Sequence, residues 1–164
     1  QRKRIERAAA RGELTSLGRG IYVRGSEDPA AALADQWPDV VRHLTDAKGH
    51  VSHRTALHFN PYSPEWFVSW PAKSYRSILL GPKRIRLLAG MPKPETRVIS
   101  MLGRPGRIST LETALLEVTE KRRGEYAPAT LTGEELEEFL LAAACRVDLK
   151  ALQAVAKRNK RGAR

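Results

Sequence analysis

The chain has 164 residues, of which 29 are Lys or Arg and 18 are Asp or Glu, so its formal net charge at pH 7 is +11. The length suits one ordinary domain or two small ones, and a content of 41% apolar and 29% charged residues excludes a disordered chain. The lone Cys145 excludes a disulfide framework and a multi-cysteine metal site, and no apolar run approaches the ~20 residues of a membrane span.

We therefore expect a cytoplasmic protein with no membrane partner, whose first candidate partner is a polyanion. The chain begins with Gln1 rather than Met, which leads us to expect an upstream segment.

Charge is segregated along the sequence. The net charges of residues 1–24, 25–49, 50–109, 110–148 and 149–164 are +5, −3, +8, −5 and +6. Such segregation favours distinct binding surfaces, although acidic solvent faces of helices would also explain the acidic blocks.

A basic helix is predicted over residues 1–11, because its apolar side chains recur at helical spacing and Gly12 is suited to end it. Strand-like runs at 14–17 and 21–24 follow. Two glycines enclose Arg19 between these runs, which predicts a β-hairpin with Arg19 at its tip.

Helices and strands alternate in the rest of the chain, and aromatic and β-branched runs separated by Pro and Gly predict a small, mostly antiparallel sheet. The three tryptophans are expected in the core, with a base-stacking platform as the alternative. The predicted elements are helices over 26–34 (capped by Ser26 or Asp28), 37–44 (with Gly49 ending it) and 53–59 (capped by Ser52), strands over 50–51, 66–70, 75–80, 84–88 and 97–102, a loop over 124–130, and three helices capped by Ser109 or Thr110, Thr132 and Asp148.

A basic helix followed directly by a hairpin is typical of the second half of a winged helix-turn-helix. Such a helix fits the major groove of DNA, and the hairpin wing lies over the adjacent backbone. A solvated basic helix with a purely structural hairpin is the alternative. The candidate DNA-binding residues are Arg2, Lys3, Arg4, Arg7, Arg11, Thr15 and Arg19.

Four phrases of the sequence, in the same order, resemble the AbiEi-family antitoxins of bacterial type IV toxin–antitoxin systems. The first, ARGELTSLGRGIYVRG at 10–25, is similar to the wing of that family. The others are GHVSHRTALHF at 49–59, ISTLETALLEV at 108–118 and VDLKALQAVAKR at 147–158. Glu117 stands where the family often has Asp.

The resemblance implies an α+β protein with a partial winged helix over 1–25 and a mixed α/β antitoxin-like domain, with C-terminal helices, over 26–164. It implies that the winged helix binds inverted repeats in duplex DNA at its own promoter and represses the operon. The second domain would counteract a nucleotidyltransferase-like toxin without a stable complex. A stand-alone winged-helix regulator, or a nucleic-acid or protein interaction module without a toxin partner, are the alternatives.

A second basic surface is a further hypothesis, against the alternative of scattered cations on a half-exposed sheet. Its residues would be Arg54, Arg84, Arg86, Arg97, Arg104 and Arg107. No catalytic residue, metal ligand or cofactor site is predicted. The histidines at 43, 50, 53 and 58 lack the cysteine or carboxylate help that zinc requires, and His53 or Arg54 is expected at the surface, where either could touch a phosphate. Neither a phosphate-binding loop nor a dinucleotide fingerprint occurs, and the carboxylate cluster of a nuclease or nucleotidyltransferase is missing, so we expect no enzyme.

Overall fold

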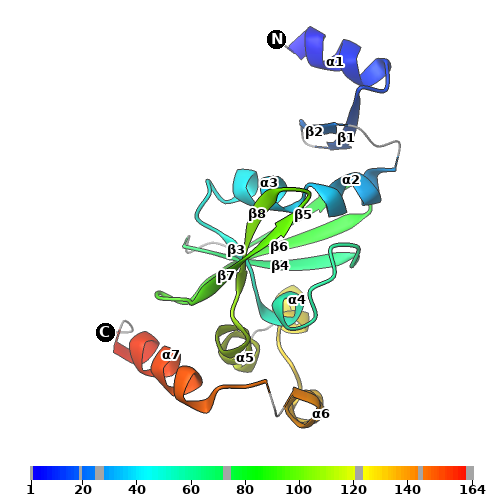
Figure 1. Ribbon diagram of the computed structural model, residues 1–164. Coiled ribbons are helices and arrows are strands. Elements are labelled where there is room, and N and C mark those ends of the chain that lie inside the picture. The colour runs from blue at the N-terminus through cyan, green and yellow to red at the C-terminus, as the bar shows by residue number, and fades with distance from the viewer. Residues whose placement is uncertain are drawn as a thin grey trace.

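The structure is a computed structural model that describes residues 2–18, 20–24, 28–71, 75–120, 124–143 and 146–161. It is a mixed α+β fold, as predicted, with a two-stranded sheet and a six-stranded sheet (Figure 1). The elements are α1 (Arg2–Ala10), β1 (Leu14–Gly18), β2 (Ile21–Arg24), α2 (Pro29–Asp35), α3 (Trp37–Leu44), β3 (His50–Val51), α4 (His53–Leu57), β4 (Glu65–Trp70), β5 (Arg76–Leu80), β6 (Lys83–Ala89), β7 (Thr96–Met101), β8 (Arg104–Ser109), α5 (Leu111–Thr119), the 3-10 helix η1 (Gly124–Ala129), α6 (Gly133–Ala143) and α7 (Leu149–Arg161).

The basic helix and the hairpin predicted at the N-terminal end are both present. Gly12 follows α1 with a φ of +74°, a left-handed conformation that favours glycine. β1 and β2 pair antiparallel. Leu17 and Val23 of the hairpin join the main hydrophobic core, and the N–H of Gly81 donates to the carbonyl of Leu17 at 2.9 Å. The hairpin is thus seated on the rest of the protein. The domain boundary at residue 25 stays a prediction.

The main sheet is larger than the sequence predicted, and it is mixed. Its strand order is β5-β6-β4-β3-β8-β7. β4 lies parallel to β6 and β3 parallel to β8, while the other three pairings are antiparallel. The sequence analysis missed β8, since Pro105 and Gly106 are poor strand formers. Gly106 has a packing role there, because a Cβ at this position would collide with the indole of Trp37.

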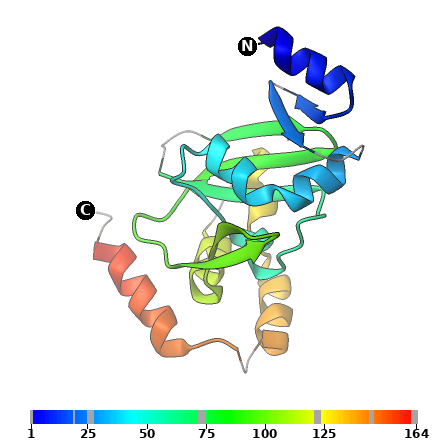
Figure 2. The ribbon, with the colours of Figure 1, turned by 45° about the horizontal axis from the view of Figure 1, so that its top comes forward.

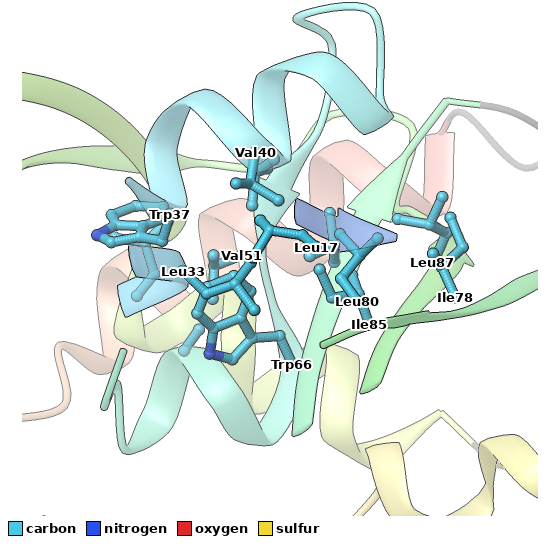
Figure 3. Close-up of a cluster of buried hydrophobic side chains, with 14 of the residues drawn as sticks. Leu17, Leu33, Trp37, Val40, Val51, Trp66, Ile78, Leu80, Ile85 and Leu87 are labelled. Carbon is cyan, nitrogen blue, oxygen red and sulfur yellow. The ribbon is translucent and has the colours of Figure 1, made fainter. Parts of the chain in front are cut away.

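Helices cover both faces of the six-stranded sheet. In Figure 1, α2 and α3 lie above it and α4 and α5 below it. The upper interface contains the largest core cluster, in which Trp37 and Trp66 are fully buried. Figure 3 shows these side chains with Leu17 of the hairpin among them. The prediction that tryptophans build the core is confirmed for these two, and Trp70 is half-buried against the same cluster.

The lower side has two smaller cores. One joins Phe67 and Leu88 of the sheet to η1, in the segment predicted as a loop. The other joins α5, α6 and α7 around Leu115 and Phe139. Within the described residues, no helix is both long and apolar enough to cross a membrane.

Local capping signals set most helix starts. The Asp28 side chain accepts the N–H of Ala30 at the start of α2, while Ser26 lies outside the described residues. The capping box of α6 is confirmed, since the N–H of Glu135 donates to Thr132 Oγ1 at 3.2 Å and the N–H of Thr132 donates to Glu135 Oε2 at 2.8 Å. Asp148 caps α7 by accepting the N–H of Lys150 at 2.8 Å.

Two helix ends differ from the prediction. α3 covers the predicted stripe 37–44, but it ends at Leu44 and does not continue to the predicted stop at Gly49, because Asp46 and Ala47 adopt φ values of +49° and +61°, which no α-helix contains. α4 ends at Leu57, two residues before the predicted end. Its N-cap residue Ser52 makes no capping hydrogen bond.

Candidate nucleic-acid interface

α1 separates its cations from its apolar side chains. Lys3, Arg4 and Arg7 are exposed, whereas Ile5 and the two alanines at 8 and 9 are half-buried. α1 packs on β1, so the apolar stripe seats the helix on the hairpin and the cations project away from it. Among the described residues, no carboxylate lies within ion-pair distance of these three cations. These three cations form a positive surface on α1 that is not tied up in described ion pairs, with Glu6 as the exposed acidic residue of the same helix.

The other residues predicted to contact DNA are less accessible to a ligand or lie outside the described residues. Arg11 is exposed, but its Nε lies 2.6 Å from Oε1 of Glu13, and this hydrogen bond lowers the pKa of Glu13. Thr15 is half-buried in β1, opposite Val23. Arg19 and the side chain of Arg2 lie outside the described residues. The positive surface that the structure describes consequently rests on Lys3, Arg4 and Arg7.

A groove of about 440 Å³ separates this region from the helix α3. Ile5 of α1 and Tyr22 of β2 line one side, and Asp39 and His43 of α3 line the other. The hairpin is therefore the main support of α1. Figure 2 shows α1 at the top of the molecule, and both views place it at the end opposite α7.

The predicted second basic surface is dispersed in the structure. Arg86 is buried. Its Nε lies 2.5 Å from Oε1 of Glu65, and its guanidinium lies over the ring of Tyr126. Arg54 Nη2 lies 2.6 Å from Oε1 of Glu135. These arginines hold β4 to β6 and α4 to α6, where each has its own carboxylate.

The remaining members of that set do not gather on one surface. Arg104 donates from Nη1 to Asp39 Oδ2 at 2.8 Å, which ties β8 to α3. Arg84, Arg97 and Arg107 are exposed, but Arg84 is on β6, which β4 and β3 separate from β8. The sequence could not show this, because each carboxylate partner comes from a distant segment.

The main chemical cluster that sequence reasoning missed lies inside the protein, around Glu117. Ser109 Oγ donates to Glu117 Oε2 at 2.8 Å, and Ser69 Oγ donates to Oε1 at 3.0 Å. The backbone N–H of His53 donates to Oε2 at 3.2 Å, and His50 Nε2 lies 3.5 Å from Oε1. One carboxylate of α5 thereby holds residues of β3, α4, β4 and β8.

Electrostatics favour the charged form of this buried carboxylate. Burial alone would raise the pKa of Glu117, but the hydrogen bond of His50, the charges of His53 and His50, and the hydroxyl of Ser109 together lower it. The side chains of His50 and Glu117 are 4% and 1% exposed, so a substrate cannot reach them. The cluster therefore acts as an internal tie between α5 and the sheet.

His53 corrects the expectation of a surface residue. Its side chain is buried, and its Nδ1 lies 2.8 Å from Ser52 Oγ. Its φ of +51° is unusual for a residue with a side chain, and this conformation lets β3 pass directly into α4 while the N–H reaches Glu117. Only Arg54 remains available to solvent from that pair.

Within the described part of the chain, no three His, Cys, Asp or Glu side chains converge to hold a metal ion. Cys145 lies outside the described residues. No model of a known protein family matches this chain, and a search of curated proteins found no match.

Proposed function

We propose that this chain is a DNA-binding transcriptional regulator of the antitoxin type. α1 would enter the major groove of duplex DNA, and the β1–β2 hairpin would lie over the neighbouring backbone as a wing. The observation that carries the proposal is the exposed trio Lys3, Arg4 and Arg7 on a helix whose other side is seated on the hairpin.

The physical support is the fit between this surface and a phosphate backbone. An α-helix fits the major groove, and each cation that meets a phosphate releases a condensed counterion. The three cations have no carboxylate partner among the described residues, so binding DNA breaks no ion pair of theirs. Lys3, Arg4 and Arg7 also lie within about two helical turns, so they can contact one stretch of groove.

The biological part of the proposal rests on the resemblance to AbiEi-family antitoxins. The protein would repress its own operon at inverted repeats in the bacterial cytoplasm. It would also counteract a nucleotidyltransferase-like toxin without a stable complex. Its activity would be binding, with neither catalysis nor a cofactor.

Fluorescence anisotropy of the full-length protein on its own promoter tests DNA binding. Replacing Arg4 and Arg7 by Ala should remove about two phosphate contacts and weaken binding. The slope of log K against log salt concentration should then become flatter by roughly 1.8. The matched control replaces two exposed cations elsewhere, Lys48 and Arg84, and should leave the slope unchanged. A wild-type protein that does not bind at low salt would refute the proposal.

Co-expression with the product of the neighbouring gene tests the antitoxin part. The full chain is needed, because Leu17 and Val23 of the hairpin belong to the main core and truncation at residue 25 would open it. The protein with Arg4 and Arg7 replaced by Ala should lose promoter repression and retain growth rescue. Repression without any rescue would instead support a stand-alone regulator.

A further inference from the structure

The strand β7 forms an edge of the six-stranded sheet, and nothing among the described residues pairs with its outer side. The opposite edge strand, β5, is approached by the hairpin, since the N–H of Gly81 next to it donates to the carbonyl of Leu17. β7 spans six residues without proline or bulge. Natural sheets usually blunt such an edge, because its unpaired N–H and C=O groups can accept another strand.

The pairing with β8 shows which backbone groups of β7 point outward. Antiparallel pairs alternate between hydrogen-bonded and non-hydrogen-bonded positions. The N–H of Thr110 donates to the carbonyl of Glu95 at 3.0 Å, in line with the β7–β8 register. Counting from that bond, Thr96, Val98 and Ser100 direct their N–H and C=O groups away from β8. Ser100 lies opposite a proline, which has no N–H to offer it.

The side chains along this edge are exposed and partly apolar. Val98 is 66% exposed, and Leu102 at the tip of the β7–β8 hairpin is 74% exposed. Leu102 has a φ of +49°, a conformation that costs free energy for a residue other than Gly, Asn or Asp. In Figure 2 this lime-green hairpin lies towards the viewer, in front of the helices below the sheet.

The charges beside this edge are positive. Arg97 is exposed on β7 itself, and Arg107 of β8 lies opposite Val98. Glu95, which precedes β7, forms an ion pair with Arg158 of α7, and Asp39 forms one with Arg104 of β8. A second copy of this chain, with its formal charge of +11, would bring Arg97 close to its own counterpart. An acidic strand would instead complement it.

We propose that β7 is a docking edge for an extended acidic segment of a partner protein. The segment would add a seventh strand to the sheet. It would exchange backbone hydrogen bonds with Thr96, Val98 and Ser100, and it would place a carboxylate beside Arg97. This interaction uses the sheet edge and is independent of DNA binding by α1.

The test uses two fluorescent peptides of alternating composition, acetyl-Thr-Glu-Val-Glu-Val-Glu-Thr-amide and the same peptide with Lys in place of Glu. Full-length wild-type protein should bind the Glu peptide saturably and the Lys peptide at least about five-fold more weakly. Arg97→Glu should reverse this preference. The matched control Arg84→Glu changes an exposed arginine of β6 and should keep the wild-type preference.

Residue-resolved amide hydrogen exchange supplies the second readout. Binding of the Glu peptide should slow exchange of the outward amides of Thr96, Val98 and Ser100, and an acidic peptide attracted only to α1 would not do so. Absence of this protection, or an unchanged preference in Arg97→Glu, would overturn the proposal. Protection of the same amides without peptide, together with a concentration-dependent dimer in sedimentation, would also overturn it by making a second copy the occupant.

Discussion

The arginines of α1 and two arginines around the six-stranded sheet, Arg54 and Arg86, have opposite environments. In α1, Arg4 and Arg7 are exposed and form no ion pair among the described residues. Around the six-stranded sheet, Arg54 and Arg86 each form an ion pair with a glutamate from another element. The net charge of +11 therefore overstates the surface available to a polyanion. The cations that can bind one are those whose folding left them without a partner.

The largest expected effect concerns Glu117, which lies buried between α5 and the six-stranded sheet. Glu117→Ala leaves two serine hydroxyls, the N–H of His53 and the ring of His50 without their acceptor in a buried site. We expect a loss of about 3–5 kcal/mol in the free energy of unfolding, measured by urea denaturation. Glu138→Ala, on the exposed side of α6, is the control and should change stability by less than about 0.5 kcal/mol.

Acid should weaken the same tie. The pKa of Glu117 in the folded protein lies below its ordinary value of 4.5, so its stabilising contribution is complete above that pH and is lost as the pH falls below it. The stability difference between wild type and Glu117→Gln should therefore shrink as the pH falls from about 5 to about 3. A difference that stays constant over this range would contradict the charged state that we assign.

The contrast between paired and unpaired arginines predicts a smaller effect. Arg86→Ala removes the partner of Glu65 and the cation over Tyr126, and it should cost about 2 kcal/mol in thermal or urea unfolding. Arg4→Ala should cost less than about 0.5 kcal/mol, since Arg4 makes no such contact. Equal losses of stability in Arg86→Ala and Arg4→Ala would contradict the different environments of these two arginines.

Lys83 should contribute to stability with a distinctive pH dependence. Its Nζ donates to the carbonyl of Pro61 at 2.7 Å and lies 4.0 Å from the ring centre of Trp66, and burial lowers its pKa to about 8 from 10.5. Between these values the unfolded chain binds more protons than the folded one, so stability from this group rises with pH. Wild type should gain stability relative to Lys83→Met between pH 8 and 10.5.

The parts of the fold that could be predicted depend on neighbours in sequence. The basic helix ended by Gly12, the hairpin and the capping box of Thr132 and Glu135 all rest on contacts within a few residues. The strand β8 could not be predicted, because its pairing partners and the indole that needs Gly106 come from elsewhere in the chain. The local residue preferences at Pro105 and Gly106 disfavour a strand, and tertiary packing outweighs these preferences.

The candidate interface could be predicted only in part, for the same reason. The exposed cations of α1 follow from helical spacing. The ion pair of Arg86 depends on Glu65. The buried position of His53 depends on Glu117, which lies 64 residues away in the sequence. No pattern in a single sequence reveals such a partner. The composition of the middle block therefore predicted more surface charge than the structure shows.

We propose that DNA binding depends on the cations of α1 that form no described ion pair. The most direct measurement is the salt dependence of promoter binding for wild type, for Arg4 and Arg7 both replaced by Ala, and for Lys48 and Arg84 both replaced by Ala. Only the α1 variant should lose affinity, and the slope of its salt dependence should be flatter by roughly 1.8. Equal slopes in all three proteins, or an equal loss in the control variant, would contradict it.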